Sequence, residues 1–129
     1  MSLNFLEETI EAIERSHHSI EDIVHIGSRR TGHSCTWDEF TKLADRTYDD
    51  GFGGQEVARD LTITFRDNGI LFRWEYDGAE WWKYIHEYPM KQNLLILEQR
   101  WPITKIIGDG DSLREMNSGI YEPYEESIL

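Results

Sequence analysis

Residues 61–88 read LTITFRDNGILFRWEYDGAEWWKYIHEY, and this stretch decides the fold. Its first residues, Leu61, Ile63 and Phe65, alternate with threonines, the two-residue period of a strand with one buried face. The pair Asn68-Gly69 favours a two-residue hairpin turn, because Asn and Gly adopt the positive φ angles of a type I′ turn, and Asp77-Gly78 marks a second reversal of the chain. The sequence therefore predicts three consecutive antiparallel strands, with residues 80–88 as the third.

A two-residue turn at Asn68-Gly69 also predicts the pairing of the first two strands. It would place apolar residues opposite one another throughout, as the pairs Phe65 with Phe72, Ile63 with Trp74 and Leu61 with Tyr76. The aromatic residues are then interpreted first as sheet-forming residues that pair across strands and pack against helices.

Two amphipathic helices are expected before this meander. The first runs from about Phe5 to His18, where Asn4 and Glu7 resemble a capping box. The second begins at Thr36, has Glu39 in the matching position and is expected to stop at Gly51. Their predicted core-facing residues are Leu6, Ile10, Ile13 and His17 in the first, and Trp37, Phe40, Leu43 and Ala44 in the second.

The remaining segments complete the predicted organisation. Residues 20–28 alternate like a short strand, and residues 93–101 favour a strand that ends at Pro102, although periodicity leaves a helix open. The fold class is α+β: an antiparallel β-meander of three to five strands packed against two α-helices. Residues 1–108 are predicted to form a single domain, and residues 109–129 an acidic C-terminal tail with one short helical turn, either mobile or lying over the sheet.

Composition restricts the classes of function. The 129 residues include 25 acids and 13 bases, a formal net charge of −12, which argues against direct binding to nucleic acid or anionic membranes. No apolar run is long enough to span a membrane, no leader pattern opens the chain, and a cytoplasmic location is expected. Such a charge attracts a basic protein partner, for example a nucleic-acid-binding factor, although on composition alone a solubility role is the commoner explanation of the acidity.

The predicted binding residues lie on the second hairpin and the first helix. Trp81 and Trp82 are adjacent, so they must point to opposite faces of a strand. One of them needs a cover beyond the core, from a helix, a second copy of the chain in a homodimer, or a ligand. The acids expected to steer a positive partner are Glu75, Asp77 and Glu80 on the hairpin, and Glu7, Glu11 and Glu14 on one flank of the first helix.

Catalytic and metal-binding interpretations have weaker support. His33 and Cys35 flank Ser34 and could ligate a metal, and Cys35 could act as a nucleophile beside a histidine, but no established metal-ligand spacing occurs. Glu75 and Glu80 could form an acid and base pair. The glycines at 51, 53 and 54 lack the order of a phosphate-binding loop. No cofactor, metal or catalytic residue is therefore predicted. The enzyme alternative is a pocket near the glycine loop that uses His25, His33, Cys35 or Glu75.

The GFGGQE loop at residues 51–56 and the YDGxEWWxY pattern at residues 76–84 resemble a family of uncharacterised small proteins encoded by phages and mobile elements of Gram-positive bacteria. The resemblance covers about residues 20–88 and implies no catalytic residue. It implies an accessory factor that binds and modulates a host protein. The expectation is a non-enzymatic acidic binding protein, with a small enzyme, a ligand-binding domain or a toxin-neutralising immunity protein as alternatives.

Overall fold

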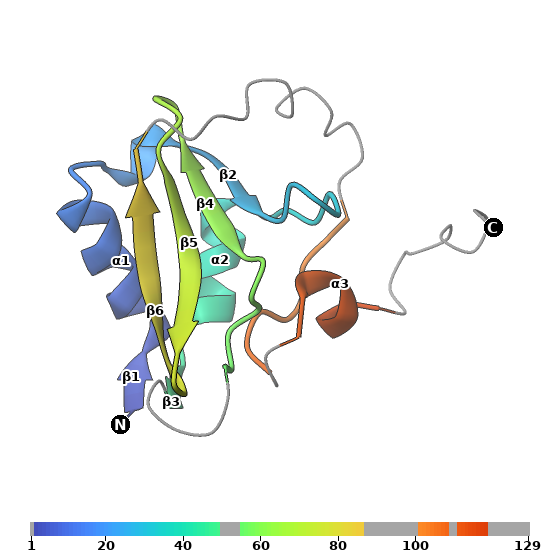
Figure 1. Ribbon diagram of the computed structural model, residues 1–129. Helices are drawn as coiled ribbons and strands as arrows, with labels where there is room; N and C mark the ends of the chain where they lie inside the picture. The colour runs from blue at the N-terminus through green and yellow to red at the C-terminus, as the bar shows by residue number, and fades with distance from the viewer. Residues whose placement is uncertain (1, 50–54, 87–100, 109–110, 119–129) are drawn as a thin grey trace.

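The protein folds into an α+β architecture in which two helices pack on one face of an antiparallel sheet (Figure 1). The computed structural model describes residues 2–49, 55–86, 101–108 and 111–118. The four-stranded sheet has the order β2-β4-β5-β6, with every neighbouring pair antiparallel. Its strands are β2 (Ile23–Gly27), β4 (Thr62–Phe65), β5 (Ile70–Tyr76) and β6 (Ala79–Ile85). The predicted meander is thus confirmed as β4-β5-β6.

The helix α1 (Phe5–Arg15) begins as predicted but ends earlier than expected. Asn4 Oδ1 accepts a hydrogen bond from the Glu7 backbone N–H at 2.9 Å, which caps the helix. His17 has a φ of 66°, a left-handed conformation that stops the helix before the expected end at His18. His17 is exposed, and it is His18 that stacks on the Phe65 ring at 4.0 Å.

The buried stripe of α1 is also shifted from the predicted one. The fully buried side chains are Phe5, Thr9, Ala12 and Ile13, whereas Leu6 and Ile10 are only half-buried. Phe5 rotates the stripe because its ring lies at the centre of the core, stacked on Trp82 with a 5.7 Å centroid distance.

The helix α2 (Trp37–Ala44) has the predicted start and an unexpected end. Thr36 and Glu39 form the complete capping box. The helix ends at Ala44 and does not reach Gly51, because the chain turns to form the strand β3 (Thr47–Asp49), which pairs with β1 (Ser2–Asn4). This two-stranded sheet was not predicted, since strands of three residues are too short to show a period.

The turn between β4 and β5 differs from the predicted type I′ turn. Asn68 has a φ of 75°, but Gly69 is not in the positive-φ region. The Phe65 N–H bonds to the Gly69 carbonyl and the Asn68 N–H to the Phe65 carbonyl, each at 2.9 Å, so the loop contains three residues. Gly69 serves a different need: a Cβ there would lie 2.4 Å from the Tyr84 hydroxyl.

The longer loop overturns the predicted register. The observed pairs are Thr62 with Phe72, Ile63 with Leu71 and Thr64 with Ile70, a shift of three residues from the expected pairing. A shift by an odd number moves all side chains of one strand to the other face of the sheet. Phe72, Trp74 and Tyr76 therefore point away from the face where Ile63 and Phe65 are buried.

The second reversal lies at Asp77-Gly78, as predicted. Asp77 and Gly78 have φ angles of 55° and 88°, as a type I′ turn requires, and Tyr76 pairs directly with Ala79. The ladder continues to the pair Ile70 and Ile85 without a bulge, and it places Arg73 opposite Trp82 and Trp74 opposite Trp81.

The core continues past the expected domain boundary at residue 108. The short helix α3 (Leu113–Met116) contains the predicted helical turn, and Leu113 belongs to the hydrophobic core with no exposed surface. The buried Asn117 side chain accepts hydrogen bonds from the backbone N–H groups of Thr104 and Lys105. Residues 111–118 therefore pack onto the domain. Of the strand predicted at residues 93–101, only Trp101 lies within the described residues, and it forms a parallel bridge with His33.

Candidate functional site

The two adjacent tryptophans lie on opposite faces of β6, as strand geometry predicts. Trp82 is only 8% exposed, and its indole N–H donates to Thr9 Oγ1 at 2.9 Å beneath α1. Trp81 is 39% exposed on the other face. The tertiary structure thus assigns Trp82 to the core and leaves Trp81 as the candidate for contact with a partner.

Three large aromatic side chains form an exposed patch on the sheet face that is opposite α1 and α2. Trp74 and Trp81 are direct cross-strand neighbours, and Tyr76 follows on the same face of β5. Their exposed fractions are 42%, 39% and 71% in the order Trp74, Trp81, Tyr76. The Lys83 ammonium lies 4.2 Å from the centroid of the Trp74 ring, a cation–π contact. We call Trp74, Tyr76 and Trp81 the aromatic patch.

The predicted acidic residues divide into three groups. Glu75 and Asp77 are exposed at the hairpin tip, where the Glu75 carboxylate accepts the Gly78 N–H at 2.9 Å. Glu75 pairs directly with Glu80, so it lies on the sheet face opposite the patch. The exposed row of Glu7, Glu11 and Glu14 lies on α1, which packs on the other face of the sheet. Glu80, in contrast, is buried: it is 1% exposed and cannot contribute to a steering surface.

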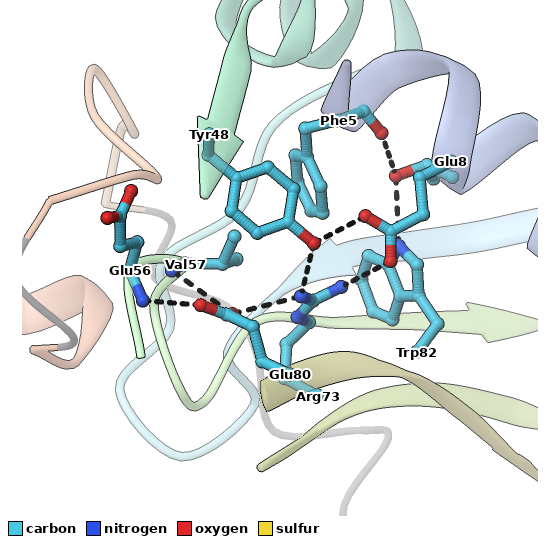
Figure 2. A network of polar contacts seen from close by, with 9 residues as sticks. Phe5, Glu8, Tyr48, Glu56, Val57, Arg73, Glu80 and Trp82 are labelled. Atoms are coloured by element: carbon cyan, nitrogen blue, oxygen red, sulfur yellow. Dashed lines mark hydrogen bonds and ion pairs between the residues drawn. The ribbon is translucent and has the colours of Figure 1, made fainter. Parts of the chain in front are cut away.

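Glu80 belongs to a buried polar network between the sheet and α1 (Figure 2). Its carboxylate lies 2.9 Å from Arg73 Nη2 and accepts hydrogen bonds from the backbone N–H groups of Glu56 and Val57. The Arg73 guanidinium also approaches Glu8 at 3.4 Å and the Tyr48 hydroxyl at 3.1 Å. The network therefore connects β5, β6, α1 and β3 with the segment that follows the glycine-rich loop.

Aromatic rings enclose the Arg73 guanidinium. Its central carbon lies 5.0 Å from the Phe5 ring centroid and 4.9 Å from that of Trp82. The side chains of Arg73 and Glu80 have no exposed surface. A buried charge needs this pairing, because an isolated ion inside a protein is strongly disfavoured. Both side chains are closed off from solvent in this structure, and their contacts join separate elements of the fold.

Tyr48 acts as a hydrogen-bond donor in this network. Burial raises the pKa of its phenol, and the hydrogen bond to Glu8 raises it further, while the Arg73 charge acts in the opposite direction. The hydroxyl therefore stays protonated and donates to the Glu8 carboxylate. Arg73 was missed as a site residue in the sequence. The signal was a charged side chain at position 73, two residues after the buried Leu71 on the inward face of β5.

The residues of the enzyme alternative do not form a catalytic cluster. Burial and the nearby Glu39 carboxylate raise the pKa of Cys35 to about 12, the opposite of an activated thiol. His33 is buried with its Nδ1 2.7 Å from Thr31 Oγ1. Glu75 lies at the tip of the β5–β6 hairpin, whereas His25 lies on β2, at the opposite edge of the sheet. Among the described residues, no group of three or more metal-ligating side chains converges on one point.

Comparisons of the chain with protein-family models, with curated proteins and with solved structures find no match. Within the part of the chain that the structure describes, no helix has the length and apolar character needed to cross a bilayer.

Proposed function

We propose that this protein is a non-enzymatic binding protein whose aromatic patch contacts a basic protein partner. The observation that carries the proposal is the position of Trp74, Tyr76 and Trp81, which lie together and exposed on one sheet face of a chain with a net charge of −12. Apolar side chains that lie together on the surface often mark an interaction site, whereas single exposed apolar residues are ordinary.

The patch has the composition of a binding centre. Trp and Tyr supply large contact areas at low conformational cost and are enriched among the residues that dominate binding energies. Asp77 in the turn after Tyr76, and Glu75 on the opposite sheet face at the same hairpin tip, supply negative charge, which accelerates encounter with a positive surface. The patch therefore contributes mainly to the affinity for the partner, and the acids mainly increase the association rate.

The position of β6 supports a protein partner. Within the described residues, β6 is the last strand of the sheet and pairs only with β5. An edge strand presents backbone N–H and C=O groups that an extended segment of another protein can pair with. Trp81 projects from this strand, so the aromatic patch reaches the sheet edge.

The resemblance to proteins of Gram-positive phages and mobile elements leads us to propose a basic, nucleic-acid-binding host factor as the partner. A toxin-neutralising immunity protein would use the same acidic and aromatic surface and would differ in its target. The enzyme alternative gains no support from a specific feature of the described residues.

The test is a pull-down from a Gram-positive bacterial lysate with the wild-type chain and with the double variant Trp74→Ser, Trp81→Ser. A basic protein captured by the wild type should be lost with the double variant. The matched control is Val24→Ser, an apolar side chain on β2 that is 53% exposed. The control should capture the partner as the wild type does.

A second arm tests the charge. Glu75→Gln with Asp77→Asn should slow association and reduce its salt dependence, while the dissociation rate changes little. The proposal fails if no basic partner is captured at low salt, or if the double tryptophan variant and the Val24→Ser control bind equally well.

A further inference from the structure

A cavity of about 400 Å³ lies on the patch side of the sheet, at the end distant from the hairpin tip. Its lining includes Arg29, Arg30, Asp60, Ile70, Phe72 and Ile85. Ile70, Phe72 and Ile85 share the outward face of β5 and β6 with Trp74. The volume lies in the range of small-molecule sites, which are usually apolar with a few polar groups at one end.

The cavity has two chemically different ends. Ile70, Phe72 and Ile85 provide an apolar floor, in which the Phe72 ring packs edge-on against Trp74 at 6.3 Å. The other end is the turn that follows β2, where Arg29 and Arg30 are consecutive. Backbone hydrogen bonds from Ser28 to the His33 carbonyl and from Gly32 to the Ser28 carbonyl, each 2.9 Å, fix this turn.

The polar end of the cavity can receive an anion at Arg30. Arg30 is exposed and has no ion pair with any residue in the described parts of the chain. One oxygen of Asp60 is already used, since it accepts the Leu113 N–H at 2.8 Å. Arg30 therefore places a guanidinium at this end of the cavity, in a protein that is otherwise strongly acidic. Guanidinium groups bind carboxylates with paired hydrogen bonds.

We propose that this cavity binds a small aromatic carboxylate, with its ring on Phe72 and its carboxylate at Arg30. The site does not depend on the proposed protein partner, because the ligand would enter beside the aromatic patch and not on it. A neutral or cationic ring would lack the charged hydrogen bonds, and a free phosphate would lack the apolar contacts.

The experiment is an NMR titration of the full chain with three probes: 1-naphthoate, 1-naphthylmethylamine and inorganic phosphate. Naphthoate should shift the backbone amides of residues 28–31, Phe72 and Ile85 in a saturable manner. The amine, which has the same ring system and the opposite charge, should bind at least about tenfold more weakly, as expected for the loss of one charged hydrogen bond. Phosphate should shift none of these amides at the same concentrations.

Two variants and one control locate the site. Arg30→Gln should weaken naphthoate binding about tenfold. Ile85→Glu, which places a carboxylate on the cavity wall at a 38% exposed position, should abolish it. Arg66→Gln removes an exposed arginine of the first hairpin loop, outside the cavity, and should leave binding unchanged.

The inference is overturned if naphthoate and the amine bind equally, if Arg30→Gln has no effect, or if naphthoate fails to bind. It is also overturned if the shifts centre on Trp74 and Trp81, which would show adsorption on the aromatic patch. None of these results bears on capture of a protein partner, so the two proposals fail independently.

Discussion

Replacing Glu80 by Gln should strongly destabilise the fold, although the substitution changes only the charge and one acceptor. The Glu80 carboxylate accepts hydrogen bonds from three donors: Arg73 Nη2 at 2.9 Å and the backbone N–H groups of Glu56 and Val57. A glutamine offers one oxygen, and its amide nitrogen faces donors. At least one of the three donors therefore loses its acceptor, and the Arg73 cation loses its closest anion.

The structure sets the magnitude. Removing one partner of a buried ion pair costs about 3–5 kcal/mol, since it leaves the other charge without compensation. Glu8 remains 3.4 Å from Arg73 and still neutralises it in part, so the lower end of that range applies. We expect a loss of about 3 kcal/mol in the free energy of unfolding, equivalent to a decrease of roughly 10 °C in Tm for a chain of this length.

The assay is urea unfolding followed by tryptophan fluorescence and circular dichroism, with amide hydrogen exchange as a local readout. The matched control is Glu75→Gln, at the position directly opposite Glu80 in the β5–β6 ladder but exposed. It should change stability by less than about 0.5 kcal/mol. In Glu80→Gln, the amides of Glu56 and Val57 should exchange faster than in the control.

Equal stabilities of Glu80→Gln and Glu75→Gln would refute the reasoning, because they would show that the burial and pairing of Glu80 carry no free energy. Unchanged exchange at Glu56 and Val57 in the Glu80 variant would refute the part of the argument that concerns the segment after the glycine-rich loop.

Further predictions concern reactivity, pH and backbone geometry. Burial raises the pKa of Cys35 to about 12, so the folded protein contains roughly a thousandfold less thiolate than the unfolded chain. At pH 8 the folded protein should therefore react with a disulfide reagent at least about 100-fold more slowly than the protein unfolded in urea. Equal rates would contradict the burial of Cys35. The His18 hydrogen bond lowers the pKa of Asp67, so the wild type should exceed Asp67→Asn in stability above about pH 5. That difference should be less than about 1 kcal/mol, because the Asp67 carboxylate is half exposed to solvent. It should vanish as the pH falls through the lowered pKa, and its persistence to about pH 2 in unfolding curves would oppose the assignment. Gly27→Ala should cost more than about 3 kcal/mol in the same assay, because a Cβ would lie 2.0 Å from the His33 carbonyl oxygen at a φ of 143°; a near-neutral result would contradict this close approach.

Local signals in the sequence determined the helix starts and one of the two hairpin turns. The Thr36 capping box forms within four consecutive residues, and the type I′ turn at Asp77-Gly78 needs only two residues that tolerate positive φ. Their energies depend on neighbouring atoms alone. The α+β class followed from the same source, since the period of the apolar residues is a property of the chain.

The tertiary structure decided which side of the sheet each residue of the hairpins occupies. Asn68-Gly69 satisfies the rule for a two-residue turn as well as Asp77-Gly78 does, but there the core selected a three-residue loop, with Gly69 against Tyr84. That choice buries Leu71 and Arg73 beside Ile63 and moves Trp74 outward. The two registers differ in which β5 side chains face α1 and α2. These helices are distant from β5 in the sequence, so the preferences of the turn residues cannot select the register.

The burial of Glu80 has the same origin. By sequence it is one acid among several at a hairpin, and it resembles Glu75 in every local respect. Arg73, Tyr48 and Glu8 come from three other elements, and only their convergence supplies the cation and hydrogen bonds that make a carboxylate acceptable in the interior. The sequence by itself thus determined the helix starts, the three-stranded meander and the acidic character of the protein. Long-range packing decided which aromatic and acidic side chains remain on its surface, because burial depends on contacts between residues that are distant in sequence and come together only on folding.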